Sequence, residues 1–232
     1  MSEIFAATPP ITVPIAHSNG AFAVRRIYCI GRNYLEHARE MGHVSQDSTL
    51  VFFNKPADAI LYVAPDVVGQ FPYPPGSNNV HHEVELVVAL GKRGRDISVE
   101  YALDYVFGYA VGLDMTRRDL QAEMKRQGYP WESAKAFDAS APLGPIHRVE
   151  EVGHCQQGAI WLKVNGVERQ RADMAQLIWP IAEVISYLST LSELAPGDLI
   201  YTGTPGGVGP IVKGDLMAAG IDGLGELTVK VT

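Results

Sequence analysis

The chain has 232 residues, of which 47% are hydrophobic, and this is enough to form the core of one sizeable globular domain. Its net charge is −7 and its basic residues are scattered, which argues against a nucleic-acid-binding protein. No run of about eighteen apolar residues occurs, so no membrane partner is expected, and a cytoplasmic protein that binds small molecules is the default interpretation.

A short buried strand is predicted at 27–30, followed closely by a helix. Asn33 is the expected N-cap of this helix, and Gly42 is placed to end it. On such a helix His37 and Glu40 are three residues apart and share one face. By itself, this pair is typical of an ordinary surface contact.

The next informative segment contains two acids on one strand. A strand is predicted at 50–53, a loop rich in proline at 71–79, and a further strand at 81–90. Alternation in this last strand places Glu83 and Glu85 on the same face, with their roots about 6 to 7 Å apart. Two carboxylates at this spacing could bind one cation. The alternative is a solvated strand face.

A third carboxylate, Asp114, follows a predicted strand at 105–113 and precedes a helix that Thr116 should start and Gly128 should end. Three carboxylates without nearby cysteines favour a hard cation, Mg²⁺ or Mn²⁺, over zinc. The alternative for Asp114 is helix capping. Alternation also puts His81 on the face of the two acids, where we expect a structural or supporting role rather than metal binding.

The second half of the chain predicts a hairpin, one longer helical region and further strands. The first arm of the hairpin lies at 160–164 and is closed by a turn at 165–166. A helical region is expected at 173–191, and two similar turns at 196–199 and 213–216 each lead into a strand. Helices therefore do not alternate regularly with strands, which predicts a β-rich α+β fold.

Five motifs follow one another along the chain. They are Gly31-Arg32-Asn33-Tyr34 with His37 and Glu40, then Glu83-x-Glu85, then 113–121, then Ala134-Lys135-Ala136-Phe137, and finally the glycine-rich segment 201–209. In these motifs the chain resembles the fumarylacetoacetate hydrolase family, from about residue 27 to the C-terminus. In the segments 55–59 and 114–121 it most resembles the short bacterial fumarylpyruvate hydrolases, and it is similar also to the acylpyruvases and oxaloacetate decarboxylases of the family.

The resemblance implies a fold and a cofactor. The fold is the mixed β-roll of the family's C-terminal domain, here expected at 25–232 after an N-terminal extension with a small strand region at 1–24, and the protein is expected to be a homodimer. Mg²⁺ or Mn²⁺ would be held by Glu83, Glu85 and Asp114, in agreement with the argument from the residues themselves.

The resemblance also implies roles for other residues. His37, oriented by Glu40 on a lid segment, is the expected base, and Lys135 is expected to stabilise an oxyanion or enolate. The alternative for Lys135 is an ordinary surface lysine. The expected substrate-binding residues are Arg32, Arg118, Gln121 and Thr204.

Three functions are carried forward. The first is carbon-carbon bond hydrolysis of an acylpyruvate, 3-fumarylpyruvate to fumarate and pyruvate, in gentisate-type aromatic catabolism. The second keeps the same site for another small 2-oxo or 2,4-dioxo acid, as an acylpyruvase, an oxaloacetate decarboxylase, or a 2-hydroxy-dienedioate isomerase or decarboxylase. The third is a metal-stabilised binding protein without turnover.

Overall fold

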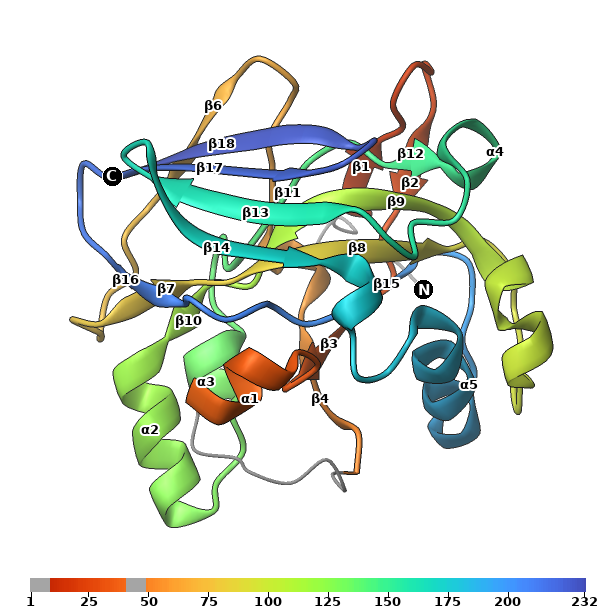
Figure 1. Cartoon of the computed structure of the whole chain (residues 1–232), viewed down its shortest axis with the longest axis horizontal. Helices are drawn as coiled ribbons and strands as arrows, with labels where there is room; N and C mark the ends of the chain where they lie inside the picture. Colours follow the sequence, from red (N-terminus) through yellow and green to blue (C-terminus); the bar gives the residue numbers. More distant parts are fainter. Residues whose placement is uncertain (1–8, 41–48) are drawn as a thin grey trace, which may run out of the picture.

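A computed structural model describes residues 9–40 and 49–232 of the protein. The larger of its two main sheets contains, in spatial order, β4 (Val51–Lys55), β3 (Arg26–Gly31), β15 (Asp198–Tyr201), β8 (Val84–Leu90), β9 (Val106–Leu113), β11 (Ala141–Leu143) and β5 (Ile60–Tyr62), with β12 (His147–Arg148) paired to β9. The second sheet contains β14 (Val167–Asp173), β13 (Ala159–Val164), β17 (Leu216–Ile221), β18 (Gly225–Val231) and β6 (Val68–Phe71). The second sheet lies above the first in Figure 1.

Smaller elements surround these sheets. The remaining strands are β10 (Thr116–Arg117), β7 (Val80–His82) and β16 (Gly209–Ile211) in one small sheet, and β1 (Thr12–Pro14) and β2 (Ala21–Ala23) in a hairpin. The α-helices are α1 (Leu35–Glu40), α2 (Arg118–Gln127), α3 (Glu132–Lys135), α4 (Val149–Val152) and α5 (Ile181–Leu191). Figure 1 shows α1, α2, α3 and α5 in the lower part of the view, at the height of β3 and β4. None of the helices in the described residues has the length and apolar character needed to cross a membrane.

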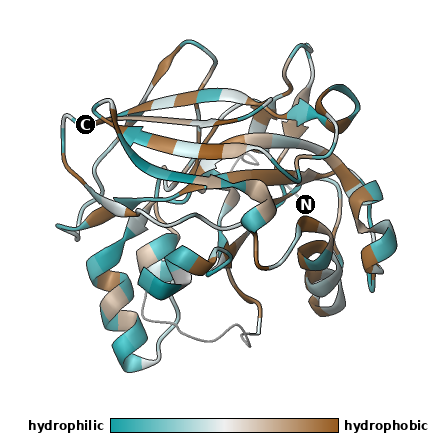
Figure 2. Cartoon of the chain, viewed as in Figure 1, coloured by the Kyte–Doolittle hydropathy of each residue, from teal (hydrophilic) through white to brown (hydrophobic). Residues whose placement is uncertain are grey.

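Strand β8 is buried on both of its faces. Leu86 and Val88 belong to the apolar cluster between the two main sheets, as the predicted alternation requires. Val87 and Ala89, on the face that Glu85 shares, belong to a second cluster that includes residues of the β1–β2 hairpin. Hydrophobic residues accordingly dominate β8 and β9 in Figure 2, whereas α2 is largely hydrophilic. The face that carries the acid therefore lies inside the protein.

Most of the predicted elements are confirmed. The structure contains the strand near residue 27 as β3 and the hairpin as β13 and β14. The helical region expected at 173–191 is in part confirmed, as a 3-10 turn at Met174–Gln176 and the helix α5. The strand expected at 81–90 is interrupted at Glu83 and forms β7 and β8, which belong to different sheets. Gly128 ends α2 with a φ of 69°, in the left-handed region where glycine is favoured over residues with a Cβ. The chain has the β-rich α+β fold that the sequence predicted.

Two predicted helix starts are wrong. Helix α1 begins at Leu35, and the Asn33 side chain instead donates to the carbonyl of Thr202 (2.8 Å) and accepts from the backbone of Trp179 (2.7 Å). Thr116 belongs to strand β10, where it pairs with His81 of β7, and α2 begins two residues later, at Arg118. Gly42, the predicted end of α1, lies outside the described residues.

Candidate active site and metal centre

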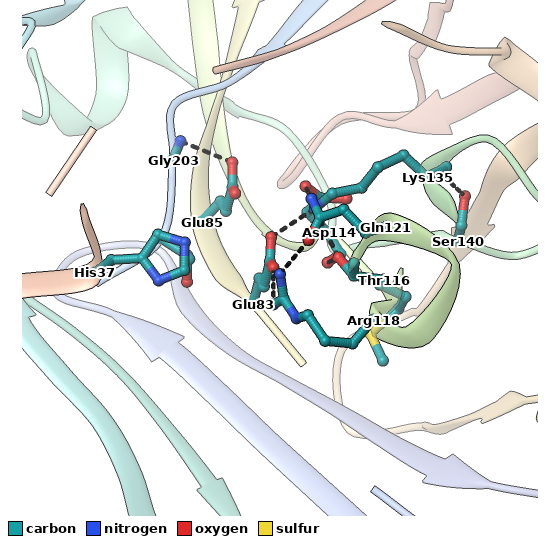
Figure 3. Close-up of polar contacts among 12 residues, drawn as sticks. His37, Glu83, Glu85, Asp114, Thr116, Arg118, Gln121, Lys135, Ser140 and Gly203 are labelled. Carbon is teal, nitrogen blue, oxygen red and sulfur yellow. Dashed lines mark hydrogen bonds and ion pairs between the residues drawn. The ribbon is translucent and has the colours of Figure 1, made fainter. Parts of the chain in front are cut away.

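Three carboxylates meet where β8 and β9 lie side by side. Glu83 lies between β7 and β8, and Glu85 lies within β8. Asp114 directly follows β9, and its backbone N–H donates to the carbonyl of Glu83 at 2.8 Å. The antiparallel pairing of β8 with β9 thus brings the three side chains together, with one oxygen of each within 4.8 Å of the others (Figure 3). All three are buried, so a solvated strand face and helix capping are both excluded.

Two of these carboxylates are neutralised by buried cations. Lys135 Nζ lies 2.7 Å from Glu83 Oε2 and 2.6 Å from Asp114 Oδ2. Arg118 also pairs with Glu83, and Lys55 Nζ lies 2.9 Å from Asp114 Oδ1. Burial acts to raise the pKa of Glu83, but the charges of Lys135 and Arg118 outweigh it and hold the pKa well below its usual range. Lys135 is itself buried and is not the surface lysine of the alternative interpretation.

Glu85 is different from its two neighbours. Its Oε2 accepts the backbone N–H of Gly203 at 2.8 Å, and no lysine, arginine or histidine in residues 9–40 and 49–232 forms an ion pair with it. Burial, followed by the charges of Asp114 and Glu83, raises its pKa well above the usual range. A third buried carboxylate without a cation leaves a place for positive charge. The donor set, three hard oxygen ligands, fits Mg²⁺ or Mn²⁺.

His37 approaches the carboxylates from the side opposite Lys135 and Arg118 (Figure 3). Its Nδ1 lies 3.7 Å from Glu40 Oε2, and this nitrogen has no hydrogen bond within the described part of the chain. Burial lowers the pKa of the imidazole, which favours the neutral form that can accept a proton. Glu40 is anchored in turn, because its Oε1 accepts the N–H of Gly207 at 2.8 Å.

A pocket opens beside the carboxylates. Nine of the ten predicted site residues line it, namely Arg32, His37, Glu83, Glu85, Asp114, Arg118, Gln121, Lys135 and Thr204. The tenth, Glu40, does not line the pocket, but its carboxylate lies beside the imidazole of His37, which does. Sequence reasoning therefore predicted which residues come together here. Their individual roles stay predictions.

The predicted substrate-binding residues are held in distinct ways. Arg118 donates to Gln121 Oε1 at 2.6 Å while it pairs with Glu83, so its guanidinium is fixed at the edge of the carboxylate group. Thr204 Oγ1 accepts from a buried glutamine, Gln170, at 2.8 Å. Arg32 has a φ of 61°, an unusual conformation for a residue with a side chain, and its buried Nε has no partner among the described residues.

His81 and the glycine-rich loop take supporting positions. His81 Nε2 lies 3.0 Å from Asn79 Oδ1, and the imidazole is not part of the pocket lining, in keeping with its expected role. In the loop, Gly207 has a φ of 92°, and a Cβ there would lie 1.9 Å from the carbonyl oxygen of Arg169. The loop can therefore pack against the neighbouring strand only because this position lacks a side chain.

Lys125 and Gln170 are among the contributors that were not anticipated. Lys125 lines the pocket, and its position four residues after Gln121 and seven after Arg118 puts it on the same helical face, a signal that the sequence contains. Gln170 is buried in β14, whose other residues are mostly exposed, and no local pattern marks it. Its Oε1 accepts from the N–H of Val84 and its Nε2 donates to Thr204, so it joins the carboxylate strand to the glycine-rich loop.

Gln170→Leu should lower stability by about 3 kcal/mol, because it leaves several buried donors and acceptors without partners. For a chain of this size the loss corresponds to a fall in Tm of about 6 to 12 °C. Thermal denaturation of Gln170→Leu beside Arg169→Gln, an exposed neighbour on the same strand, measures it. Equal Tm values for the two variants would show that the buried hydrogen bonds of Gln170 contribute nothing to stability.

Comparison with known proteins agrees with this geometry. The family model described as "Fumarylacetoacetate (FAA) hydrolase C-terminal" matches residues 26–232. The chain belongs to the fumarylacetoacetate hydrolase family, as its motifs predicted.

Individual relatives differ in the reactions that their names give. The chain is similar to the crystal structure of fumarylpyruvate hydrolase from Pseudomonas aeruginosa in complex with Mn²⁺ and pyruvate, with 52% identity, a TM-score of 0.98, and coverage of 100% of this chain and 99% of that one. It is 42% identical to the human mitochondrial oxaloacetate tautomerase FAHD1, over 89% of this chain and 91% of that protein. It is 38% identical to a mitochondrial oxaloacetate decarboxylase of Dictyostelium discoideum, over 86% of this chain and 90% of that protein.

Proposed function

We propose that the protein is a divalent-metal-dependent hydrolase that cleaves a carbon-carbon bond in an acylpyruvate, with 3-fumarylpyruvate as substrate and fumarate and pyruvate as products. The observation that carries the proposal is the meeting of three buried carboxylates with a buried histidine in one pocket. Similarity to a fumarylpyruvate hydrolase that binds Mn²⁺ and pyruvate supports it further.

Glu83, Glu85 and Asp114 would hold Mg²⁺ or Mn²⁺, which supplies a Lewis acid for the 2-oxo group of the substrate when bound. Arg118 and Gln121 then bind the polar atoms at the metal-binding end of the substrate, since Arg118 pairs with Glu83 and donates to Gln121. Thr204, held by its hydrogen bond from Gln170, contributes a hydroxyl from the opposite loop.

His37 acts as the general base. Its neutral imidazole takes a proton from a water molecule, and the resulting hydroxide adds to the acyl carbonyl that lies far from the pyruvate carboxylate. The bond between this carbonyl carbon and the methylene breaks, and its electron pair goes to the pyruvate enolate, which is then protonated to pyruvate. The hydroxyl group stays on the acyl carbon, which becomes the carboxyl group of fumarate. Glu40 stabilises the protonated imidazole, and Lys135 donates to the oxygen on which negative charge develops.

We also propose that the protein acts as a homodimer in the cytoplasm on a small 2,4-dioxo acid, in gentisate-type aromatic catabolism. Residues 25–232 form the catalytic domain and 1–24 an N-terminal extension, a division supported by the family match, which begins at residue 26.

Replacing His37 by alanine should lower kcat by about 10²- to 10⁴-fold, because the reaction loses its base. The increase in Tm on adding Mn²⁺ should persist, because His37 forms no ion pair with the metal-binding carboxylates. Steady-state kinetics and thermal denaturation of His37→Ala beside His17→Ala, a change at an exposed histidine, separate the two effects. Unchanged activity in His37→Ala would instead favour a binding protein without turnover.

A second reaction at the same site is favoured by the relatives named oxaloacetate tautomerase and oxaloacetate decarboxylase. Values of kcat/KM on 3-fumarylpyruvate and on oxaloacetate, at saturating Mg²⁺ or Mn²⁺, decide between the two. We expect the larger value on 3-fumarylpyruvate, with equal amounts of fumarate and pyruvate released. Absence of pyruvate release together with rapid turnover of oxaloacetate would assign the second function.

A further inference from the structure

Two cations of the pocket have no acidic partner. Lys125 and Arg32 are half-buried and line the pocket, yet neither side chain forms an ion pair or a side-chain hydrogen bond with residues 9–40 and 49–232. The other basic residues at the site, Lys135, Arg118 and Lys55, are all paired with carboxylates. The two unpaired cations are therefore available for an anion that enters the pocket.

These two cations also repel each other. Burial, together with the positive charges of Arg32 and Arg118, lowers the pKa of Lys125 to about 8. Burial lowers the pKa of Arg32 as well. Two like charges, partly removed from water and facing one space, are unfavourable until a negative charge lies between them.

Lys125 forms no ion pair with the three carboxylates, and its backbone position is separate from theirs. It follows Arg118 by seven residues on α2, which is about 10 Å along the helix axis. Arg118 contacts Glu83, so α2 presents one cation at the metal-binding end of the pocket and a second cation about two turns further on. This separation along the helix is comparable with the length of a chain of several carbon atoms.

The surface near Lys125 is aromatic. The rings of Phe53 and Trp131 both line the pocket, with their centroids 6.0 Å apart. Lys125 Nζ lies 5.3 Å from the centroid of Trp131, so a cation-π contact holds the ammonium group beside this ring. An unsaturated carbon chain can pack against the rings while a charged group at its end reaches the cations.

We propose that Lys125 and Arg32 form a second anion-binding subsite, which binds the carboxylate at the far end of a dicarboxylic 2-oxo or 2,4-dioxo acid. Lys125 is then a specificity-determining residue that favours such diacids over acylpyruvates with an uncharged end. This assignment rests on the proposed function for the orientation of the substrate, with its 2-oxo acid end at Glu83, Glu85 and Asp114.

The test uses two inert 2-oxo acids that differ only at the far end. Calorimetry with the Mn²⁺-loaded protein measures the binding of 2-oxoadipate, which carries a second carboxylate, and of 2-oxohexanoate, which does not. Wild type should bind the diacid about 10- to 100-fold more tightly. Lys125→Gln should lose most of this preference, and Lys125→Arg, which keeps the charge, should retain it. Arg126→Gln removes an exposed charge from the same helix and serves as the matched control.

Equal binding of the two acids by wild type, or a preference that survives in Lys125→Gln, would overturn the subsite. A fall in the preference in Arg126→Gln as large as that in Lys125→Gln would also overturn it, because net charge alone would then explain the result. The readout does not depend on turnover. If 3-fumarylpyruvate is not cleaved but the diacid preference follows Lys125, the proposed reaction fails and the subsite stands.

Discussion

Glu85→Gln should lower the rate of metal-dependent pyruvate release by at least about 10³-fold. The variant loses a metal ligand, and the bound metal stabilises the charge of the transition state by several kcal/mol. The metal-free variant should be at least as stable as the wild type. Glu85 is buried without a cationic partner in the described part of the chain, so its charge costs folding energy. A glutamine can still accept the hydrogen bond from Gly203.

Glu83→Gln is the matched control and should behave differently. It removes the carboxylate that pairs with Arg118 and one of the two that pair with Lys135, so we expect the metal-free protein to lose about 3 to 5 kcal/mol of stability. Thermal denaturation with chelator and with Mn²⁺, together with pyruvate release, compares the two variants. A metal-free Glu85→Gln protein that is as unstable as Glu83→Gln would assign Glu85 a structural role and contradict its proposed role as a metal ligand.

Lys135→Met should have the second large effect. In the metal-free protein the change leaves Glu83 and Asp114 without the ammonium group that bridges them, and stability should fall by about 3 to 5 kcal/mol. Mn²⁺ should recover most of this loss, because a divalent cation replaces the missing positive charge. Activity should stay about 10²- to 10³-fold below the wild type even with Mn²⁺, because the donor to the developing charge is absent.

Unfolding by denaturant with and without Mn²⁺, combined with steady-state kinetics, measures both parts of this prediction. Lys213→Met changes an exposed lysine and should alter neither quantity. If Mn²⁺ restores the activity of Lys135→Met together with its stability, Lys135 only balances charge, and its proposed role in the reaction is wrong.

The common face of Glu83 and Glu85 could be predicted because it depends only on residues that are neighbours in the sequence. Alternation alone places Glu83 and Glu85 on one face, and the structure has both in one group. Alternation could not show that this face is buried, since that depends on the second apolar cluster, to which distant strands contribute. The approach of Asp114 depends on the pairing of β8 with β9, which was not predicted; the family resemblance implied only that the three carboxylates meet.

Contacts between residues that lie far apart in the chain could not be predicted from the sequence. Gln170 lies 86 residues from Val84 and 34 from Thr204, and its contacts exist only in the folded chain. Asn33 was expected to cap a helix, the usual role of its residue type, but its side chain joins two distant loops. Lys125 is a different case, because its spacing from Arg118 and Gln121 was visible in the sequence.

The central claim is metal-dependent cleavage of a carbon-carbon bond, and the most direct test is the release of pyruvate and fumarate from 3-fumarylpyruvate by the wild-type protein. The assay is run with Mn²⁺, after chelation, and after Mn²⁺ is added back. The account predicts equal amounts of both products with Mn²⁺, loss of release after chelation and recovery on addition. Release that continues undiminished in chelator, or no release in any condition, would contradict it.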